Sequence, residues 1–182
     1  MTPRFRDPMV MISDCPASVE DRAIPGHWEG DLICGAASKS AIGCLVERPT
    51  RFTMLLHLPN GHDALAVGQA VITKMQHLPK LLRNSLTWDQ GSEMTLHKPI
   101  TAALDMDLYF CDPHSPWQRG TSENTNGLVR QYFPKGTDLS VYSEAYLDAV
   151  AEELNDRPRK TLNWENHPRK YSNSSLKCCN RP

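Results

Sequence analysis

The sequence lacks a long apolar run, a paired cysteine motif and a strong net charge. No apolar run is long enough to span a bilayer, which argues against a transmembrane protein. The first 16 residues contain acids and prolines where a secretory signal would need an unbroken apolar stretch. We therefore expect a cytoplasmic protein with no membrane partner.

The spacing of the six cysteines argues against a zinc site and against a disulfide framework. None of them forms a Cys-x-x-Cys pair, which disfavours a zinc site or a disulfide framework. Cys34, Cys44 and Cys111 lie inside apolar runs, where free cysteine behaves as a small buried hydrophobe. We expect these three to be reduced thiols in the core.

The net charge of −1 does not by itself indicate a nucleic-acid-binding protein. The charge is unevenly distributed, because acids outnumber bases over 1–165 whereas the charged residues of 166–182 are all basic. If the body of the protein binds DNA, it needs metal ions, a local basic stripe or another domain to offset its own acids.

The 182 residues are enough for one domain with a sizeable core. Short apolar runs bounded by Gly, Pro or polar residues predict strands, and the tight joints between the first three predict an antiparallel meander. The predicted strands are 27–35, 40–48, 51–59, 85–89 and 107–111.

Helices are predicted between and after the later strands. Asp63 begins a stripe of apolar residues at spacings of three and four that Pro79 closes. Further helices are predicted at 97–105, about 121–133 and about 141–155, the last with a buried stripe of Tyr142, Ala145, Tyr146, Ala149 and Val150. This order predicts an α/β fold with a mixed five-stranded sheet flanked by helices.

Three acids fall at positions where carboxylates could meet. Asp31 lies in the middle of the first strand, Asp89 ends the fourth, and Glu123 lies in the first turn of a helix. Taken singly, they could be an edge residue, a turn former and a residue that favours the positive end of a helix. Taken together, they match the need of two Mg²⁺ ions for carboxylates held on rigid elements during phosphoryl transfer.

Three blocks of sequence around these acids carry a family resemblance. The blocks GHWEGDLI (26–33), LTWDQGSEM (86–94) and DPHSPWQRGTSENTNGLVRQYFPKGTDLS (112–140) resemble the catalytic blocks of the insertion sequence 30 family of bacterial transposases. Asp89 and Glu123 are separated by 33 residues, the spacing of this family. The resemblance covers roughly 20–165 and implies a ribonuclease H-like fold, as in DDE transposases and retroviral-type integrases.

The resemblance also implies a site and a reaction. Asp31, Asp89 and Glu123 correspond to the catalytic, metal-binding triad, with two Mg²⁺ or Mn²⁺ ions as cofactors. The family's reaction frees a 3′-hydroxyl at a transposon end by hydrolysis and joins it to target DNA, so DNA is the implied partner. Strand alternation puts Glu29 on the face of Asp31, and Glu29 and Glu93 are predicted to orient the metal ligands.

The helix that carries Glu123 is predicted to face DNA. Glu123, Asn126, Gly127 and Arg130 share one polar stripe, and the alternative is a solvated helix face. The predicted DNA-binding residues are Arg119, Asn126, Arg130 and Lys135.

The residues predicted to pack in the core or at its rim, rather than stack on bases, are Trp28, Trp88 and Trp117. His27 and His114 are not expected to bind metal.

The two ends of the chain depart from the family pattern. We predict an irregular arm at 1–25, a catalytic core at 26–165, and an irregular or out-of-frame tail at 166–182. On this interpretation the chain is a truncated member without the family's end-recognition region. It would be either an active strand-transferase core, or a catalytically inactive remnant that pairs with intact transposase and inhibits it. A nuclease of ribonuclease H type unrelated to transposition is disfavoured by the length of the third block.

Overall fold

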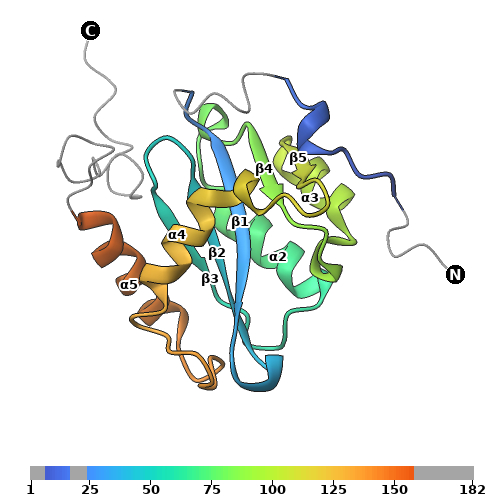
Figure 1. Cartoon of the computed structure of the whole chain (residues 1–182). Helices are drawn as coiled ribbons and strands as arrows, with labels where there is room; N and C mark the ends of the chain where they lie inside the picture. Colours follow the sequence, from blue (N-terminus) through green and yellow to red (C-terminus); the bar gives the residue numbers. More distant parts are fainter. Residues whose placement is uncertain (1–6, 17–23, 158–182) are drawn as a thin grey trace, which may run out of the picture.

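A five-stranded mixed sheet forms the centre of the molecule in the computed structural model, which describes residues 7–16 and 24–157 (Figure 1). The strands are β1 (His27–Cys34), β2 (Ala41–Glu47), β3 (Thr53–Leu56), β4 (Ser85–Trp88) and β5 (Asp107–Phe110). Their order across the sheet is β3-β2-β1-β4-β5. β1, β2 and β3 pair antiparallel, whereas β4 pairs parallel with β1 and β5 pairs parallel with β4. The predicted meander followed by alternating units is confirmed.

Helices α2 (Ala64–Met75) and α3 (His97–Leu104) make the crossovers to the parallel strands. The Asp63 carboxylate caps the start of α2 by accepting a hydrogen bond of 2.8 Å from the amide of Ala66. An N-cap of this kind stabilises a helix by about 1 kcal/mol. Val67, Val71 and Met75 of the predicted stripe are buried in the larger apolar core on this face of the sheet. The helix itself ends at Met75, before Pro79.

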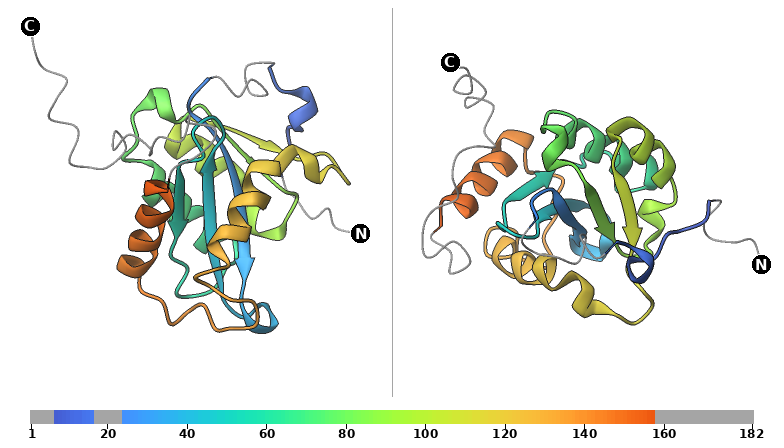
Figure 2. Two further views of the ribbon diagram at one scale, coloured as in Figure 1. Left: turned by 60° about the vertical axis from the view of Figure 1, so that its left-hand side comes forward. Right: turned by 90° about the horizontal axis from the view of Figure 1, so that it is seen from above.

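Helices α4 (Gly120–Val129) and α5 (Glu144–Asp156) cover the other face of the sheet (Figure 2). Here the predicted buried stripe of α5 is only partly correct, because Val150 is buried and Tyr142 is half-buried, whereas Ala145, Tyr146 and Ala149 are exposed. The buried residues of the helix are Leu147, Val150, Ala151, Leu154 and Asn155. The aliphatic side chains pack on the sheet, and Tyr146 instead stacks on Tyr142 beside Phe133.

Strand β1 divides its side chains between the two faces. Trp28 and Leu32 pack in the core under α2 and α3, whereas Ile33 packs in the core under α4 and α5. Gly30 lies beneath Trp88, since a Cβ atom there would come within 2.0 Å of the Trp88 ring. Glu29 and Asp31 share one face of the strand, as predicted, and both contact α4.

Residues 7–16 of the predicted arm lie against β5. Met11 forms a parallel bridge with Phe110, and Ile12 is buried beside Tyr109 in the short 3₁₀ helix η1 (Ile12–Asp14). This segment is therefore attached to the sheet. The predicted tail at 166–182 lies outside the described residues. Across the described part of the chain, no helix is long and apolar enough to cross a membrane.

Candidate active site

Asp31 and Asp89 approach each other through a shared partner, Arg119. The parallel pairing of β1 with β4 sets Glu29 opposite Thr87, so two residues further on Asp31 comes level with Asp89. Arg119 ends the 3₁₀ helix η5 (Pro116–Arg119). Its Nη1 lies 3.2 Å from Asp31 Oδ1, and its Nη2 lies 3.6 Å from Asp89 Oδ2. The fold therefore brings two of the three predicted acids to one place.

Asp31 is the more enclosed of the two aspartates. Its Oδ1 accepts a hydrogen bond of 2.9 Å from the amide of Leu32, and its Oδ2 accepts one of 2.8 Å from Asn126 Nδ2 on α4. Burial raises the pKa of Asp31, and the nearby Arg119 guanidinium opposes that rise. Asn126 thus orients a predicted catalytic acid, and its predicted contact with DNA stays a prediction.

Asp89 is both a turn residue and a neighbour of Asp31. Its Oδ1 accepts a hydrogen bond of 2.9 Å from the amide of Gly91, which fixes the turn after β4. Its other oxygen faces Arg119, and its side chain is 39% exposed. The turn therefore holds one oxygen of Asp89 and leaves the other accessible.

Glu123 lies in the first turn of α4 and is exposed. No hydrogen bond or ion pair within the described residues joins it to Asp31 or Asp89. In the same part of the chain, no three His, Cys, Asp or Glu side chains are grouped so that they could hold a metal ion. The triad therefore stays a prediction, with two acids joined through Arg119 and the third one helical turn beyond Arg119.

Glu29 fixes the start of α4 to the sheet. It is fully buried, and its Oε2 accepts a hydrogen bond of 2.8 Å from the amide of Ser122, one of the helix-start amides that lack a partner within the helix. Its Oε1 pairs with Arg48 Nε at 3.1 Å, and Arg48 Nη2 donates to the Gln118 carbonyl. Glu29 and Arg48 together hold the segment that carries Arg119 and Glu123.

Arg48 was missed in the sequence analysis. It stands at the end of an apolar strand run, and a base there beside a strand with internal acids was the available signal. A buried acid needs a paired charge or hydrogen-bond donors, and Glu29 is such an acid. The pairing itself depends on the sheet register, which the sequence pattern alone does not fix.

The other predicted site residues lie elsewhere on the surface. Arg130 donates hydrogen bonds to the carbonyls of Cys34, at 2.9 Å, and Phe133, at 3.4 Å. Lys135 is exposed after α4. Glu93 Oε1 accepts a hydrogen bond of 3.2 Å from Trp88 Nε1, so it orients that indole. The DNA contacts predicted for Arg119, Arg130 and Lys135 stay predictions.

The three tryptophans near the acids differ in their surroundings. Trp28 and Trp88 are fully buried in the core, as predicted. Trp117 is 70% exposed, so its predicted packing in the core or rim is wrong. It lies in the short helix η5, whose neighbouring residues Gln118 and Arg119 make the buried contacts. Its ring is therefore left to the solvent.

The cysteines of the described residues are free thiols. Cys44 and Cys111 are buried, as predicted, and Cys34 is half-buried. Burial raises the pKa of both buried thiols, that of Cys111 to about 11. They are therefore protonated at neutral pH and fit the expected role of small core residues.

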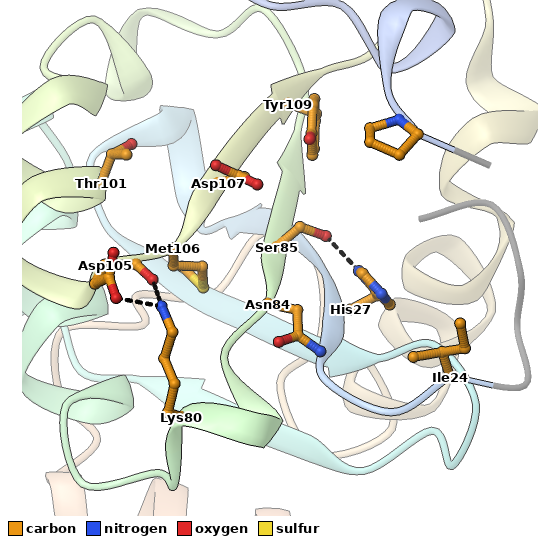
Figure 3. Close-up of a pocket in the computed structure, with 11 residues that line it drawn as sticks. Ile24, His27, Lys80, Asn84, Ser85, Thr101, Asp105, Met106, Asp107 and Tyr109 are labelled. Carbon is orange, nitrogen blue, oxygen red and sulfur yellow. Dashed lines mark hydrogen bonds and ion pairs between the residues drawn. The ribbon is translucent and has the colours of Figure 1, made fainter. Parts of the chain in front are cut away.

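A separate hollow of about 460 Å³ lies at the opposite end of the parallel strands (Figure 3). It is lined by His27, Ser85 and Asp107, the first residues of β1, β4 and β5. His27 Nδ1 lies 2.7 Å from Ser85 Oγ, which gives His27 a partner within the protein. Because Asp89 follows the carboxyl end of β4, this hollow and the acidic site occupy different ends of the sheet.

Comparison with known proteins assigns the chain to a family. The model of the integrase core domain matches residues 21–116, which include Asp31 and Asp89. The transposase for insertion sequence element IS1086 from Cupriavidus metallidurans is 58% identical over 156 residues. The transposase InsI for insertion sequence element IS30C from Escherichia coli K12 is 51% identical over 148 residues.

The chain belongs to the insertion sequence 30 family of transposases, which contain an integrase core domain. The two matches cover 86% and 81% of this chain but 46% and 38% of the relatives' own lengths. The chain thus spans less than half of these transposases.

A solved structure supports the fold of this family member. The chain resembles one in the structure of a simian T-cell lymphotropic virus intasome in complex with the PP2A regulatory subunit B56 gamma. The TM-score is 0.58 at 17% sequence identity, over 85% of this chain and 54% of that one. The ribonuclease H-like, integrase-type fold is therefore confirmed.

Proposed function

We propose that this chain is a metal-dependent DNA strand-transferase core. It would hydrolyse a phosphodiester at a transposon end and then direct the freed 3′-hydroxyl at a phosphodiester of target DNA. Asp31, Asp89 and Glu123 would carry this chemistry. The supporting observation is the convergence of Asp31 and Asp89 on Arg119, at the start of the helix that carries Glu123.

The residues present fit a divalent cation. Asp31 and Asp89 direct carboxylate oxygens at one positively charged group, and carboxylate oxygens are the ligands that Mg²⁺ and Mn²⁺ favour. When bound by these acids and Glu123, two such ions would activate the attacking oxygen and stabilise the leaving oxygen. The guanidinium of Arg119 stands in for that positive charge.

The surrounding side chains would keep the acids in place. Asn126 holds one oxygen of Asp31, and the turn amide of Gly91 holds one oxygen of Asp89. Glu29 and Arg48 fix the helix start from which Glu123 projects. Positioning of this kind matters because phosphoryl transfer depends on the alignment of the attacking and leaving oxygens.

The partners follow from the proposed reaction. DNA would be bound at the acids and along α4, with Arg130 and Lys135 near phosphates. We also expect the chain to associate with itself or with a longer transposase, in the cytoplasm of a bacterium, since the relatives named above are bacterial.

The test is strand transfer by the purified chain on oligonucleotides that mimic a joined transposon end. With Mn²⁺ or Mg²⁺ we expect nicked and joined products, and none with EDTA. Asp89→Asn removes one ligand charge with little change in shape, so it should lower product formation at least about 100-fold. If the folded parent and Asp89→Asn are equally inactive, the non-catalytic or inhibitory interpretation is favoured instead.

A further inference from the structure

Arg119 occupies the space between the two aspartates. Each terminal nitrogen faces a different acid, at 3.2 Å from Asp31 and 3.6 Å from Asp89. The Arg119 side chain is only 15% exposed, so its guanidinium is largely shielded from water, although the Asp89 side chain is 39% exposed. The guanidinium and a metal ion held by the same oxygens would therefore compete for one position.

The electrostatics explain why a cation is needed there. Two carboxylates at close range repel each other, and burial of Asp31 adds to the cost of its charge. Although burial alone would lower it, Asp31 and Asp89 raise the pKa of Arg119. A guanidinium is always charged in proteins, so Arg119 between the two acids offsets the repulsion between their carboxylates.

Arg119 differs in its bonding from Arg48, the other arginine of this region. Arg48 is embedded by its hydrogen bonds to Glu29 and the Gln118 carbonyl. The Nε and Nη1 of Arg119 are buried and make no hydrogen bond within the described residues, although Nη1 is ion-paired with Asp31. A buried donor without an acceptor costs free energy, so the two ion pairs are the polar contacts that hold Arg119 in place.

We propose that Arg119 is an exchangeable cation, which neutralises Asp31 and Asp89 until divalent metal displaces it and which then binds a DNA phosphate. The proposal rests on the proposed function. It adds an order of events, in which metal binds first and thereby releases a phosphate-binding residue. A guanidinium suits the second role because its forked donors match phosphate oxygens.

The exchange has a thermodynamic consequence that does not depend on catalysis. Metal binding to the wild type must break the two ion pairs of Arg119, whereas in Arg119→Gln it breaks none. The variant should therefore bind Mn²⁺ about fivefold or more tightly, at the lower end of typical coupling between sites. Conversely, Ca²⁺ should strengthen DNA binding by the wild type more than by Arg119→Gln.

The experiment is a calorimetric titration of the full chain with Mn²⁺, with circular dichroism to verify folding. Arg157→Gln is the matched control, because it removes the same charge from a residue whose contacts are with Tyr132, Gln131 and Glu153. Arg119→Lys keeps the positive charge and should bind Mn²⁺ about as tightly as the wild type. It also tests the proposal if Arg119→Gln does not fold.

The outcomes separate the two proposals. Tighter Mn²⁺ binding by Arg119→Gln, unchanged binding by Arg157→Gln and loss of binding by Asp89→Asn support the exchange. If Asp89→Asn abolishes binding but Arg119→Gln binds equally or more weakly, the exchange is refuted and the metal site survives. If Arg119→Gln does not fold, tighter binding by Arg119→Lys than by the wild type refutes it. If Mn²⁺ binding does not depend on Asp89, both the metal site and the exchange are refuted.

Discussion

Glu29 is a fully buried acid whose two oxygens are both in use. An ion of this kind is tolerated only when its partners offset the loss of hydration. Arg48 supplies the opposite charge, and the helix-start amide of Ser122 supplies a second donor. The pair therefore joins β1, the end of β2 and the start of α4 at one point behind the acids.

Removing one charge of the pair should be costly. We expect Glu29→Gln to lower the free energy of unfolding by about 3 kcal/mol or more, because it removes the opposite charge from beside the buried guanidinium of Arg48. The measurement is urea denaturation. The double variant with Arg48→Met should recover part of the loss. Asp105→Asn, at an exposed ion pair with Lys80, is the control and should change little. If Glu29→Gln lowered the free energy of unfolding as little as Asp105→Asn, the Glu29–Arg48 pair would not be what holds α4 on the sheet.

The shifted pKa of His27 should make the stability of the protein depend on pH. Burial, together with the nearby Arg48 charge, lowers the pKa of His27 in the folded protein. The unfolded chain therefore binds a proton at this residue more readily, so the contribution of His27 to stability is present above about pH 6.5 and is lost as the pH falls below it.

The corresponding measurement is urea unfolding at pH 7.5 and pH 5.5. The wild type should lose stability between these values, and His27→Gln should lose less of it. His77→Gln, at an exposed position after α2, is the matched control and should behave as the wild type. An identical pH dependence in His27→Gln and the wild type would contradict this account of His27.

Helix α5 protects the edge of the sheet. Asn155 accepts a hydrogen bond of 2.8 Å from the amide of Thr53 and donates one of 2.9 Å to its carbonyl. β3 is an edge strand, and unpaired backbone groups at an edge invite pairing with other chains. The amide side chain of Asn155 therefore takes the place of a further strand at this position.

Replacing this side chain should affect stability and self-association together. We expect Asn155→Ala to lower the free energy of unfolding by about 1–3 kcal/mol, because it leaves buried groups of Thr53 without partners. Gln69→Ala, at an exposed position on α2, should cost less than about 0.5 kcal/mol. Denaturation and light scattering measure the two effects. An Asn155→Ala chain as stable as Gln69→Ala would show that α5 holds β3 by apolar packing alone.

Sequence patterns predicted most of the helices and strands, but not which face of α5 is buried. The strands and α2 were predictable because apolar runs and turn residues are local signals. The face of α5 was not, because Tyr146 and Leu147 are both apolar enough to fill the predicted stripe. Which of the two is buried depends on how the helix packs against the sheet. In the structure Leu147 is buried, and Tyr146 contacts Phe133 at the surface. Aliphatic and aromatic residues on one helix are distinguished by tertiary packing.

The candidate site was predictable as a set of residues and not as a set of contacts. The sequence blocks that resemble the family, together with their spacing, identified Asp31, Asp89 and Glu123 as the candidate catalytic acids. The sequence placed Arg119 and Asn126 on a polar surface for DNA, and the fold turned both toward Asp31. These pairs are separated by more than 80 residues in the chain, so only the packing of α4 on the sheet brings them together.

At the scale of the whole molecule, the sheet separates two apolar cores, with α2 and α3 on one face and α4 and α5 on the other (Figure 2). The net charge of −1 gives little general attraction for DNA. The chain therefore needs a local means to hold phosphates close to the carboxylates. A divalent cation at Asp31 and Asp89 would supply it.

The most direct test is anomalous X-ray diffraction from crystals of the chain grown with Mn²⁺. We expect Mn²⁺ density contacting Asp31 and Asp89, with Glu123 drawn to the same site. Density confined to other positions, such as the hollow beside His27 and Asp107, would show that these acids do not hold the metal. Saturating Mn²⁺ with the two aspartates still paired to Arg119 would show the same.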